Sequence, residues 1–319
     1  MAEVGRLSPS KITTYLGCSF AYFLHYIQHE RVPTRLNLGF GKGVHFMLDK
    51  FYNTNFKSAE SFGNYWKHYW LSYVAGDFLR GREKTDLVVR EIPTKKGSIR
   101  VGNHVTWWGD DSQVLGAVFG YMKLVEDILR RFYERHKEQK PPIASEQGFG
   151  VRKDEIISLR GHEFRGVFDR IDTDEERWFI TDYKTDKSSP ENDAFTLHRH
   201  LQFTLYSWAF RQKYGKLEKA ILYYHLRTGK VFKTHRSQQD YDYLARVCDI
   251  VAEGVDKGVF IPFYGYHCNF CDYKAPCERY SIDYHGGQKI NLDTRIIGAE
   301  EFDEWELHTP QCMLSRESS

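Results

Sequence analysis

The 319-residue sequence contains no apolar run that approaches the ~20 residues of a membrane-spanning helix, and its amino terminus lacks the apolar core of a signal peptide. We therefore expect a soluble, cytoplasmic protein with no membrane partner. No Gly-x-x-x-x-Gly-Lys-[Ser/Thr] motif occurs, which excludes a P-loop ATPase within this chain. The net charge is only +2, so any nucleic-acid surface must be a local patch.

Cysteine is scarce, and half of it is concentrated in one short segment. The six cysteines are Cys18, Cys248, Cys268, Cys271, Cys277 and Cys312. In a cytosolic chain, the spacing Cys268-x2-Cys271-x5-Cys277 favours a metal site over disulfides. Three thiolates form a soft-metal site that needs one more ligand. We assign no chemistry to Cys248, and Cys312 in a polar tail is expected to be a bystander.

The hydrophobic content of 41% allows a sizeable core. The most informative stretch of the sequence is residues 166–185. Aromatic and β-branched residues there predict two strands separated by an acidic turn at 174–176. Two adjacent strands would place Asp169 and Asp182 side by side at one end of a sheet. Because side chains alternate along a strand, Asp182 and Lys184 would face the same way.

Two carboxylates and an ammonium group that converge in this way indicate a metal site. Paired carboxylates repel each other unless a cation lies between them, and oxygen ligands suit Mg²⁺ or Mn²⁺. The nearby lysine can stabilise phosphate charge or help to activate a metal-bound water. For an isolated Asp-x-Lys, a surface salt bridge at a hairpin is the commoner alternative.

Four motifs, taken together, favour the metal site. They are Gly41-x-x-x-His45, Gly166-x-x-Asp169-Arg170-Ile171-Asp172, Asp182-Tyr183-Lys184-Thr185 and Gln202-x-x-x-Tyr206. In this order, across roughly residues 40 to 206, they resemble the PD-(D/E)XK nuclease superfamily and specifically its RecB-like branch. The resemblance implies hydrolysis of DNA phosphodiesters with one or two Mg²⁺ or Mn²⁺ ions.

The resemblance also gives each motif residue a role. It assigns metal binding to His45, Asp169, Asp182 and the carbonyl group of Tyr183. Lys184 would position or activate water and stabilise the charge of the transition state. Gln202 and Tyr206, four residues apart on one helical face, would hold the DNA strand. Glu146, in the preceding strand, is an accessory ligand candidate, with a plain strand-surface charge as the alternative.

The resemblance further implies an iron–sulfur cluster. The iron–sulfur members of this branch hold a [4Fe-4S] cluster. By this resemblance, its first ligand in this chain would be Cys18, and the other three would be Cys268, Cys271 and Cys277. Such a cluster would be structural, because it clips the carboxy-terminal segment onto the amino-terminal helix and closes a loop of about 250 residues. The competitor is Zn²⁺, held by the four cysteines or by three of them with His267, and spacing does not separate the two metals.

The expected activity is that of an exonuclease on single-stranded DNA or DNA ends. Without a P-loop, the chain looks like the stand-alone CRISPR-associated or viral RecB-like exonucleases; a viral protein would act in the host cytoplasm. Helicases and CRISPR or recombination proteins are the candidate partners. One alternative is a catalytically silent, cluster-stapled DNA-binding or assembly subunit. Another is a zinc-stabilised RNA-binding module, which would leave the acidic motifs unexplained.

The predicted architecture is α/β. A mixed-sheet, restriction-endonuclease-like core would have helices on both faces, a helical lobe and a cluster-stapled carboxy-terminal segment. We divide the chain into 1–38 with one cluster cysteine, a core at 39–260 with an insertion at 61–140, the cysteine segment 261–285 and a tail at 286–319. Within the insertion, residues 80–100 carry seven basic and three acidic side chains, which predicts a solvated loop or a phosphate-contacting lid.

Four further elements are expected from local patterns. Trp66, Trp70 and Tyr73 suggest an amphipathic helix that packs on the core. A long helix is expected at about 112–140, ended by two prolines, and another at about 195–213. Residues 156–159 and 164–171 are expected to form a hairpin.

Overall fold

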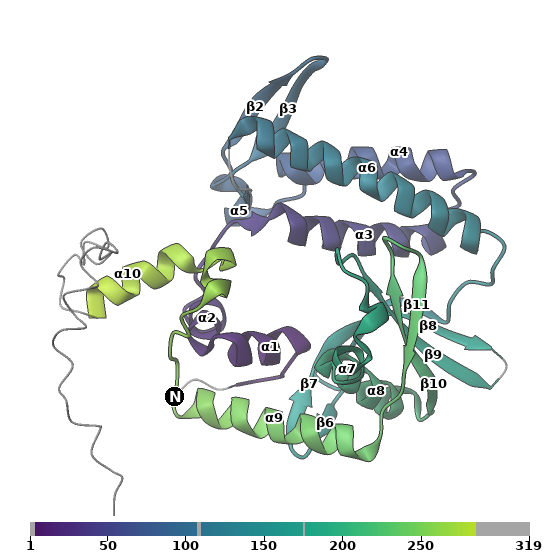
Figure 1. Ribbon diagram of the computed structural model, residues 1–319, viewed down its shortest axis with the longest axis vertical. Helices are drawn as coiled ribbons and strands as arrows, with labels where there is room; N and C mark the ends of the chain where they lie inside the picture. The colour runs from purple at the N-terminus through teal and green to yellow at the C-terminus, as the bar shows by residue number, and fades with distance from the viewer. Residues whose placement is uncertain (1–3, 107–109, 175, 285–319) are drawn as a thin grey trace, which may run out of the picture. The chain divides into compact units, whose positions relative to one another are not determined.

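The computed structural model of the protein describes residues 4–106, 110–174 and 176–284 (Figure 1). The chain divides into two compact units, residues 1–273 and residues 274–319. All candidate site residues except Cys277 lie in the first unit. The second is described only by helix α10 (Lys274–Tyr284), and the predicted tail at 286–319 lies outside the described residues. Within the described ranges, no helix is both long and apolar enough to cross a membrane.

A five-stranded mixed sheet forms the centre of the first unit. In spatial order its strands are β11 (Lys230–Thr234), β10 (Glu218–His225), β9 (Arg177–Lys184), β8 (Gly166–Asp174) and β5 (Ala144–Phe149). The β9 and β10 strands are parallel, and the other neighbours are antiparallel. Alternate residues of β9 are buried in two different cores, Ile180 in one and Tyr183 in the other. The central strand is therefore covered on both faces.

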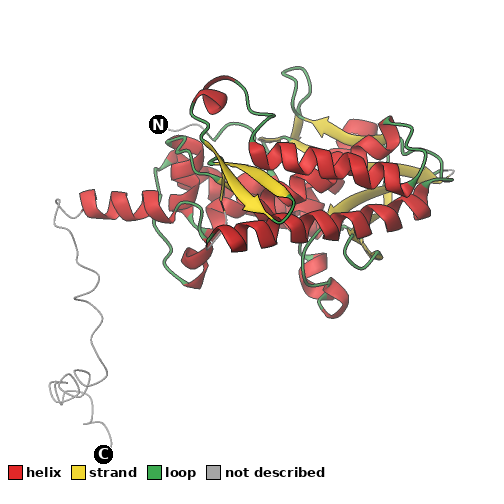
Figure 2. Ribbon diagram, turned by 90° about the horizontal axis from the view of Figure 1, so that it is seen from above, coloured by secondary structure: helices red, strands yellow, loops and turns green. Residues whose placement is uncertain are grey.

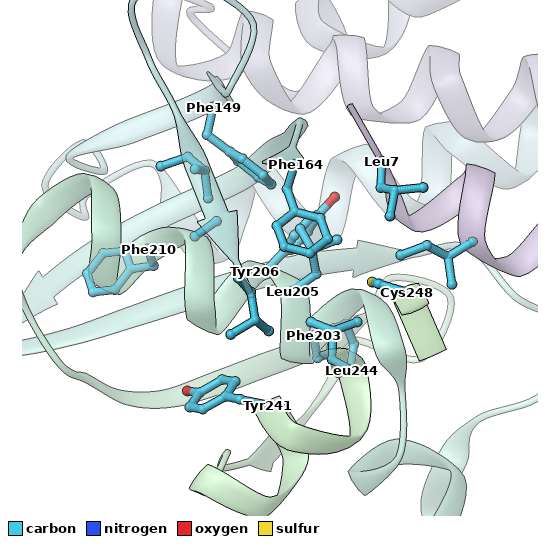
Figure 3. Close-up of a cluster of buried hydrophobic side chains, with 14 of the residues drawn as sticks. Leu7, Phe149, Phe164, Phe203, Leu205, Tyr206, Phe210, Tyr241, Leu244 and Cys248 are labelled. Carbon is cyan, nitrogen blue, oxygen red and sulfur yellow. The ribbon is translucent and has the colours of Figure 1, made fainter. Parts of the chain in front are cut away.

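Helices cover both faces of this sheet, as predicted (Figure 1). One group consists of α3 (Leu36–Asn53), α4 (Ala59–Ala75) and α6 (Asp111–His136); the other consists of α1 (Pro9–Gly17), α8 (Leu201–Tyr214) and α9 (Gln238–Asp256). In the first group, Trp66 and Trp70 of α4 are fully buried and donate hydrogen bonds to backbone carbonyls of α6 at 3.2 and 3.0 Å. Figure 3 shows the core that contains Ile180, where Phe203 and Leu205 of α8 face Leu244 and Cys248 of α9. The predicted mixed α/β architecture is confirmed.

The basic segment at 80–100 is not the loop we expected. It forms the short helix α5 (Gly81–Thr85) and most of an antiparallel hairpin of β2 (Val89–Thr94) and β3 (Gly97–Gly102). Ile92 and Val101 are buried, so one face of the hairpin packs on the protein while its charged side chains face outward. The hairpin projects beyond the long helices in Figure 1 and lies in front of them in the view of Figure 2.

Three predicted boundaries also differ from the structure. We expected a helix at 112–140, but α6 ends at His136, before the prolines. The expected helix at 195–213 is broken at His200, whose backbone is extended, into α7 (Ala194–His198) and α8. Arg236 donates to the carbonyl of Leu197, in the last turn of α7, at 3.3 Å. It also donates at 3.4 Å to the carbonyl of His200, which accepts from the backbone nitrogens of Phe203 and Thr204 as well.

The third difference is the hairpin that we placed between 156–159 and 164–171. Its second arm is the separate strand β7 (His162–Phe164), which pairs with β6 (Ile157–Leu159), whereas β8 belongs to the central sheet. The remaining elements are short: α2 (Ser19–Tyr22), η1 (Phe23–Ile27), β1 (Thr34–Arg35), β4 (Val105–Thr106), η2 (Pro190–Asn192) and η3 (Tyr266–Phe270).

Candidate metal and catalytic site

Three carboxylates lie in a row across adjacent strands of the central sheet. The residues on either side of Glu146 in β5 pair with those on either side of Asp169 in β8. Glu146 itself interrupts the ladder with a left-handed backbone (φ 47°), and its carboxylate lies within 4.8 Å of that of Asp169. The last pair between β8 and β9 is Arg170 with Thr181, and one step further places Asp169 opposite Asp182. The strand register, which follows from burial of both faces, therefore brings these side chains together.

His45 of α3 lies over this row. Its Nδ1 atom is 3.3 Å from Asp169 Oδ1 and 3.4 Å from Glu146 Oε1, and its Nε2 atom is 3.1 Å from the carbonyl oxygen of Tyr183. One donor atom each from His45, Glu146 and Asp169 all lie within 4.8 Å of one another. Burial by itself lowers the pKa of His45, but the two carboxylates outweigh it and raise that pKa well above 6.5.

Asp182 and Lys184 form a buried ion pair beside this group. Asp182 is fully buried, and its Oδ2 atom lies 2.9 Å from Lys184 Nζ. Burial raises the pKa of Asp182, and the neighbouring Asp169 adds to the rise while Lys184 opposes it. For Lys184, burial favours loss of the proton, but Asp182 and Asp169 keep its pKa above the ordinary value. The ammonium group is therefore retained at neutral pH and faces the carboxylate row.

Gln202 of α8 contacts the ion pair from the next layer, and Tyr206 contacts Gln202. The Gln202 amide donates to Asp182 Oδ1 at 2.9 Å, and its Oε1 atom accepts from Lys184 Nζ at 2.9 Å. The same amide group lies 2.9 Å from the Tyr206 hydroxyl, and Tyr206 is buried. Gln202 therefore bridges both members of the Asp182–Lys184 pair, and Tyr206 lies behind it.

A cleft of about 510 Å³ opens beside His45. It is lined by Gly41, Lys42, His45, Phe46, Asp49 and Glu146. Lys42, Phe46 and Asp49 were not singled out in the sequence, although they lie at −3, +1 and +4 from His45, the spacing of one helical face. This periodicity was the signal that could have found Lys42 and Asp49.

The glycine-rich start of this motif has a packing reason. A Cβ atom on Gly43 would lie 2.9 Å from the ring of Trp66, so only glycine lets α3 approach α4 at this point. In contrast, a Cβ atom on Gly41 would meet only the hydroxyl of Thr185, at 3.7 Å. Gly43 thus positions the helix that presents His45, while Gly41 leaves the mouth of the cleft open.

Three cysteines of the first unit, Cys18, Cys268 and Cys271, lie where residues 259–271 meet the amino-terminal helices. Cys18 separates α1 from α2, and the backbone nitrogen of Phe263 is 3.5 Å from its sulfur. Burial raises the pKa of Cys271, and the Cys18 and Cys268 thiols raise it further, so the three groups are close enough to interact. Cys277 is on α10 in the other unit, and Cys312 is not among the described residues.

Further hydrogen bonds tie the same two segments together. The Tyr15 hydroxyl donates to the Val259 carbonyl at 2.9 Å, and the Ser19 hydroxyl donates to the carbonyl and accepts from the amide of Ile261 at 3.1 and 2.8 Å. Cys248 lies elsewhere: it is fully buried in the core, and burial raises the pKa of its thiol to about 12. Such a thiol is inert, which agrees with our assigning it no chemistry.

Comparison with known proteins gives one decisive match. The chain matches the family model of the PD-(D/E)XK nuclease superfamily over residues 6–278. No curated protein matches it. The crystal structure of SSO0001 shares 16% identity, with 51% of this chain and 74% of that chain covered and a TM-score of 0.32. Because the family model spans most of the sequence, including the strands that carry Asp169 and Asp182, this chain belongs to the PD-(D/E)XK nuclease superfamily.

Proposed function

We propose that this protein is a RecB-like DNA exonuclease that acts on single-stranded DNA or on DNA ends. Membership of the superfamily already makes it a metal-dependent nuclease that hydrolyses phosphodiesters. The observation that carries the proposal is the convergence of His45, Glu146 and Asp169 beside the buried Asp182–Lys184 pair. The first three residues form the candidate metal-binding group, and Lys184 supplies a cation for a phosphate beside them, on an adjacent strand of the central sheet.

The donor set fits Mg²⁺ or Mn²⁺. The row of Glu146, Asp169 and Asp182 carries three negative charges when ionised and Lys184 one positive charge, so a divalent ion balances the remainder. His45, Asp169, Asp182 and the Tyr183 carbonyl would hold it, with Glu146 as the accessory ligand; His45 must lose its proton to bind metal. When bound, such an ion polarises the phosphate and lowers the pKa of a water molecule.

The protein's own groups then have defined tasks. Lys184, fixed by Asp182 and Gln202, directs its ammonium group toward the carboxylate row, where it can donate a hydrogen bond to a phosphate oxygen or to the attacking water. Lys42 and Phe46 on the same cleft offer one cation for a neighbouring phosphate and one ring for a base. A cleft with one such pair favours a single strand over a duplex.

We further propose that Cys18, Cys268, Cys271 and Cys277 hold a structural [4Fe-4S] cluster. The support is the clustering of three of these thiols and the hydrogen bonds that join residues 15–19 to 259–263. Burial and the neighbouring thiols raise the pKa of Cys271, and a bound metal would stabilise its thiolate form. Zn²⁺ remains the competing metal, and elemental analysis of anaerobically purified protein separates the two: iron supports the proposal, and stoichiometric zinc without iron rules it out.

The substrate is tested with end-labelled DNA, with and without Mn²⁺. We expect Mn²⁺-dependent release of short products from a linear single strand and no cleavage of a covalently closed single-stranded circle of the same sequence. Blunt duplex DNA should be cut more slowly than duplex with frayed ends. Equal cleavage of the circle and the linear strand would show an endonuclease and overturn the proposed exonuclease activity.

A further inference from the structure

A second cavity, of about 370 Å³, lies where the carboxy-terminal ends of α3 and α6 meet. Its lining residues are Phe51, Tyr52, Asn53, Thr54, Asn55, Phe56, Tyr133, His136, Lys137, Gln139 and Pro141. Its size is within the ~300–1,000 Å³ of small-molecule sites. No residue of the metal-binding group lines it, so it is distinct from the cleft beside His45.

The cavity lies along the same face of α3 as His45 of the metal-binding group. His45, Asp49 and Tyr52 lie along one side of α3, and Asn53 donates to the Asp49 carboxylate at 2.9 Å, which links the cleft to the cavity. The seven residue steps from His45 to Tyr52 span about 10 Å of helix. At the 3.4 Å spacing of stacked nucleotides, this distance corresponds to about three nucleotide steps.

The walls combine aromatic rings with neutral polar groups. Phe51, Tyr52, Phe56 and Tyr133 are half-buried, while Asn55 presents an exposed amide with two donors and one acceptor. Tyr52 is held in place because its hydroxyl accepts from Arg170, whose guanidinium is paired bidentately with Asp172 at 2.6 and 2.8 Å. Rings in fixed positions lose little freedom when they bind a flat ligand.

One polar atom in the wall lacks a partner within the described part of the chain. His136 is only 7% exposed, and its Nε2 atom is buried without a hydrogen bond. Its Nδ1 atom is engaged, 2.7 Å from the Gln139 amide and 3.3 Å from Arg170. Because Nε2 is itself buried, His136 contributes a ring to the wall, packed on Phe132 at a centroid distance of 4.2 Å, and offers no free hydrogen-bonding atom to a ligand.

The lining excludes other ligand classes. It contains no carboxylate, so it does not suit a metal ion or an organic cation. Its one lysine, Lys137, is already paired with Glu134 at 2.6 Å, so it does not suit an isolated phosphate. Rings with amides and an imidazole suit a neutral, flat heteroaromatic group.

We propose that this cavity binds one base of the DNA strand whose scissile phosphate lies at the metal site, within about three nucleotides of that phosphate. The inference rests on the proposed nuclease function. In this role the cavity would position the strand, prefer some bases over others, and so set which phosphate lies at the metal site.

The test is a scan of single-stranded oligonucleotides that carry one abasic position each. With the wild-type protein, loss of the base at one position near the scissile bond should lower kcat/KM by about tenfold, the scale of one or two hydrogen bonds and a stacked ring. Asn55→Ala and the cavity-filling Thr54→Trp should remove that dependence, so that intact and abasic strands are cut equally slowly. Asn37→Ala and Asn37→Trp, at an exposed position in the first turn of the same helix, should keep it.

Binding of the same oligonucleotides, followed by fluorescence anisotropy in the presence of a chelator, gives a readout that needs no cleavage. Absence of cleavage with position-dependent binding would contradict the nuclease and leave the base site standing. Equal binding and equal cleavage at every abasic position, or a dependence that persists in both cavity variants, would overturn the base site alone.

Discussion

Asp169 accepts a hydrogen bond from the backbone nitrogen of Tyr183 at 2.8 Å through one carboxylate oxygen and faces His45 Nδ1 at 3.3 Å with the other. A single side chain therefore joins β8 to the strand that carries Asp182 and to the helix that carries His45. The oxygen that faces His45 is the one left for a metal ion, because the other is already engaged.

Replacing this carboxylate by an amide should weaken metal binding while keeping the contact with Tyr183. We predict that Asp169→Asn lowers the affinity for Mn²⁺ at least about tenfold, because the amide loses the charge but its oxygen can still accept from the backbone. Calorimetric titration measures this affinity. Asp154→Asn, at an exposed position, should bind Mn²⁺ like the wild type, and unchanged affinity in Asp169→Asn would remove Asp169 from the metal site.

Gln202 offers a way to separate two roles. If it orients the Asp182–Lys184 pair, Gln202→Ala should lower kcat by about 10- to 100-fold with little change in KM, because the pair loses hydrogen bonds to both of its members. Tyr206→Phe removes only the hydroxyl that Gln202 contacts and should cost less than about tenfold. A rise in KM at constant kcat would instead assign Gln202 to holding the strand.

The cysteine site makes a prediction about stability. Cys18→Ala should lower the thermal midpoint by several degrees and abolish bound iron, because it releases a cross-link that closes a loop of about 250 residues. Cys312→Ala, expected from the sequence to be a bystander, is the matched control. Full iron content and an unchanged midpoint in Cys18→Ala would exclude Cys18 as a ligand.

Buried His136 predicts how stability depends on pH. Burial, with the nearby Arg170 adding to it, lowers the pKa of His136 to about 4. The folded-state pKa lies below the unfolded value of 6.5, so the unfolded chain takes up the proton first as the pH falls. The stability from burying the neutral ring is thus complete above pH 6.5 and is lost between pH 6.5 and pH 4, by up to ~3 kcal/mol.

Urea unfolding at pH 7.5, 5.5 and 4.5 measures this loss. His136→Gln, which has no group to titrate, should show a shallower decline over that range than the wild type. An identical decline in both proteins would show that His136 is not buried as a neutral group.

The sequence predicted the central strands and the pairing of Asp169 with Asp182 because both signals are local. Strand-forming residues flank a short acidic turn, and alternation then fixes which side chains share a face. The two buried tryptophans of α4 were predicted as core in the same way. The predicted assignment of Gln202 and Tyr206 to one helical face also agrees with the structure, although their contact with the ion pair depends on how α8 packs on the sheet.

Other features could not be predicted from local patterns. In the 80–100 segment, the many charges favoured a loop, although Ile92 within it and Val101 just after it are buried. Burial of one hairpin face depends on a hydrophobic surface supplied by another part of the chain. The break at His200 is bridged by Arg236, 36 residues later, which donates to the carbonyls of Leu197 and His200. The second cavity is formed by the ends of two helices distant in sequence, and no motif marks it.

The most direct test of the account is Mn²⁺-dependent cleavage of end-labelled single-stranded DNA by Lys184→Ala. The account predicts a loss of at least about 100-fold, the scale of removing one group that stabilises transition-state charge, with the fold retained by circular dichroism. Asp182→Ala should be equally inactive, and Lys187→Ala, at an exposed position three residues on, should retain activity. Near-normal cleavage by purified Lys184→Ala would contradict the assignment of the catalytic site.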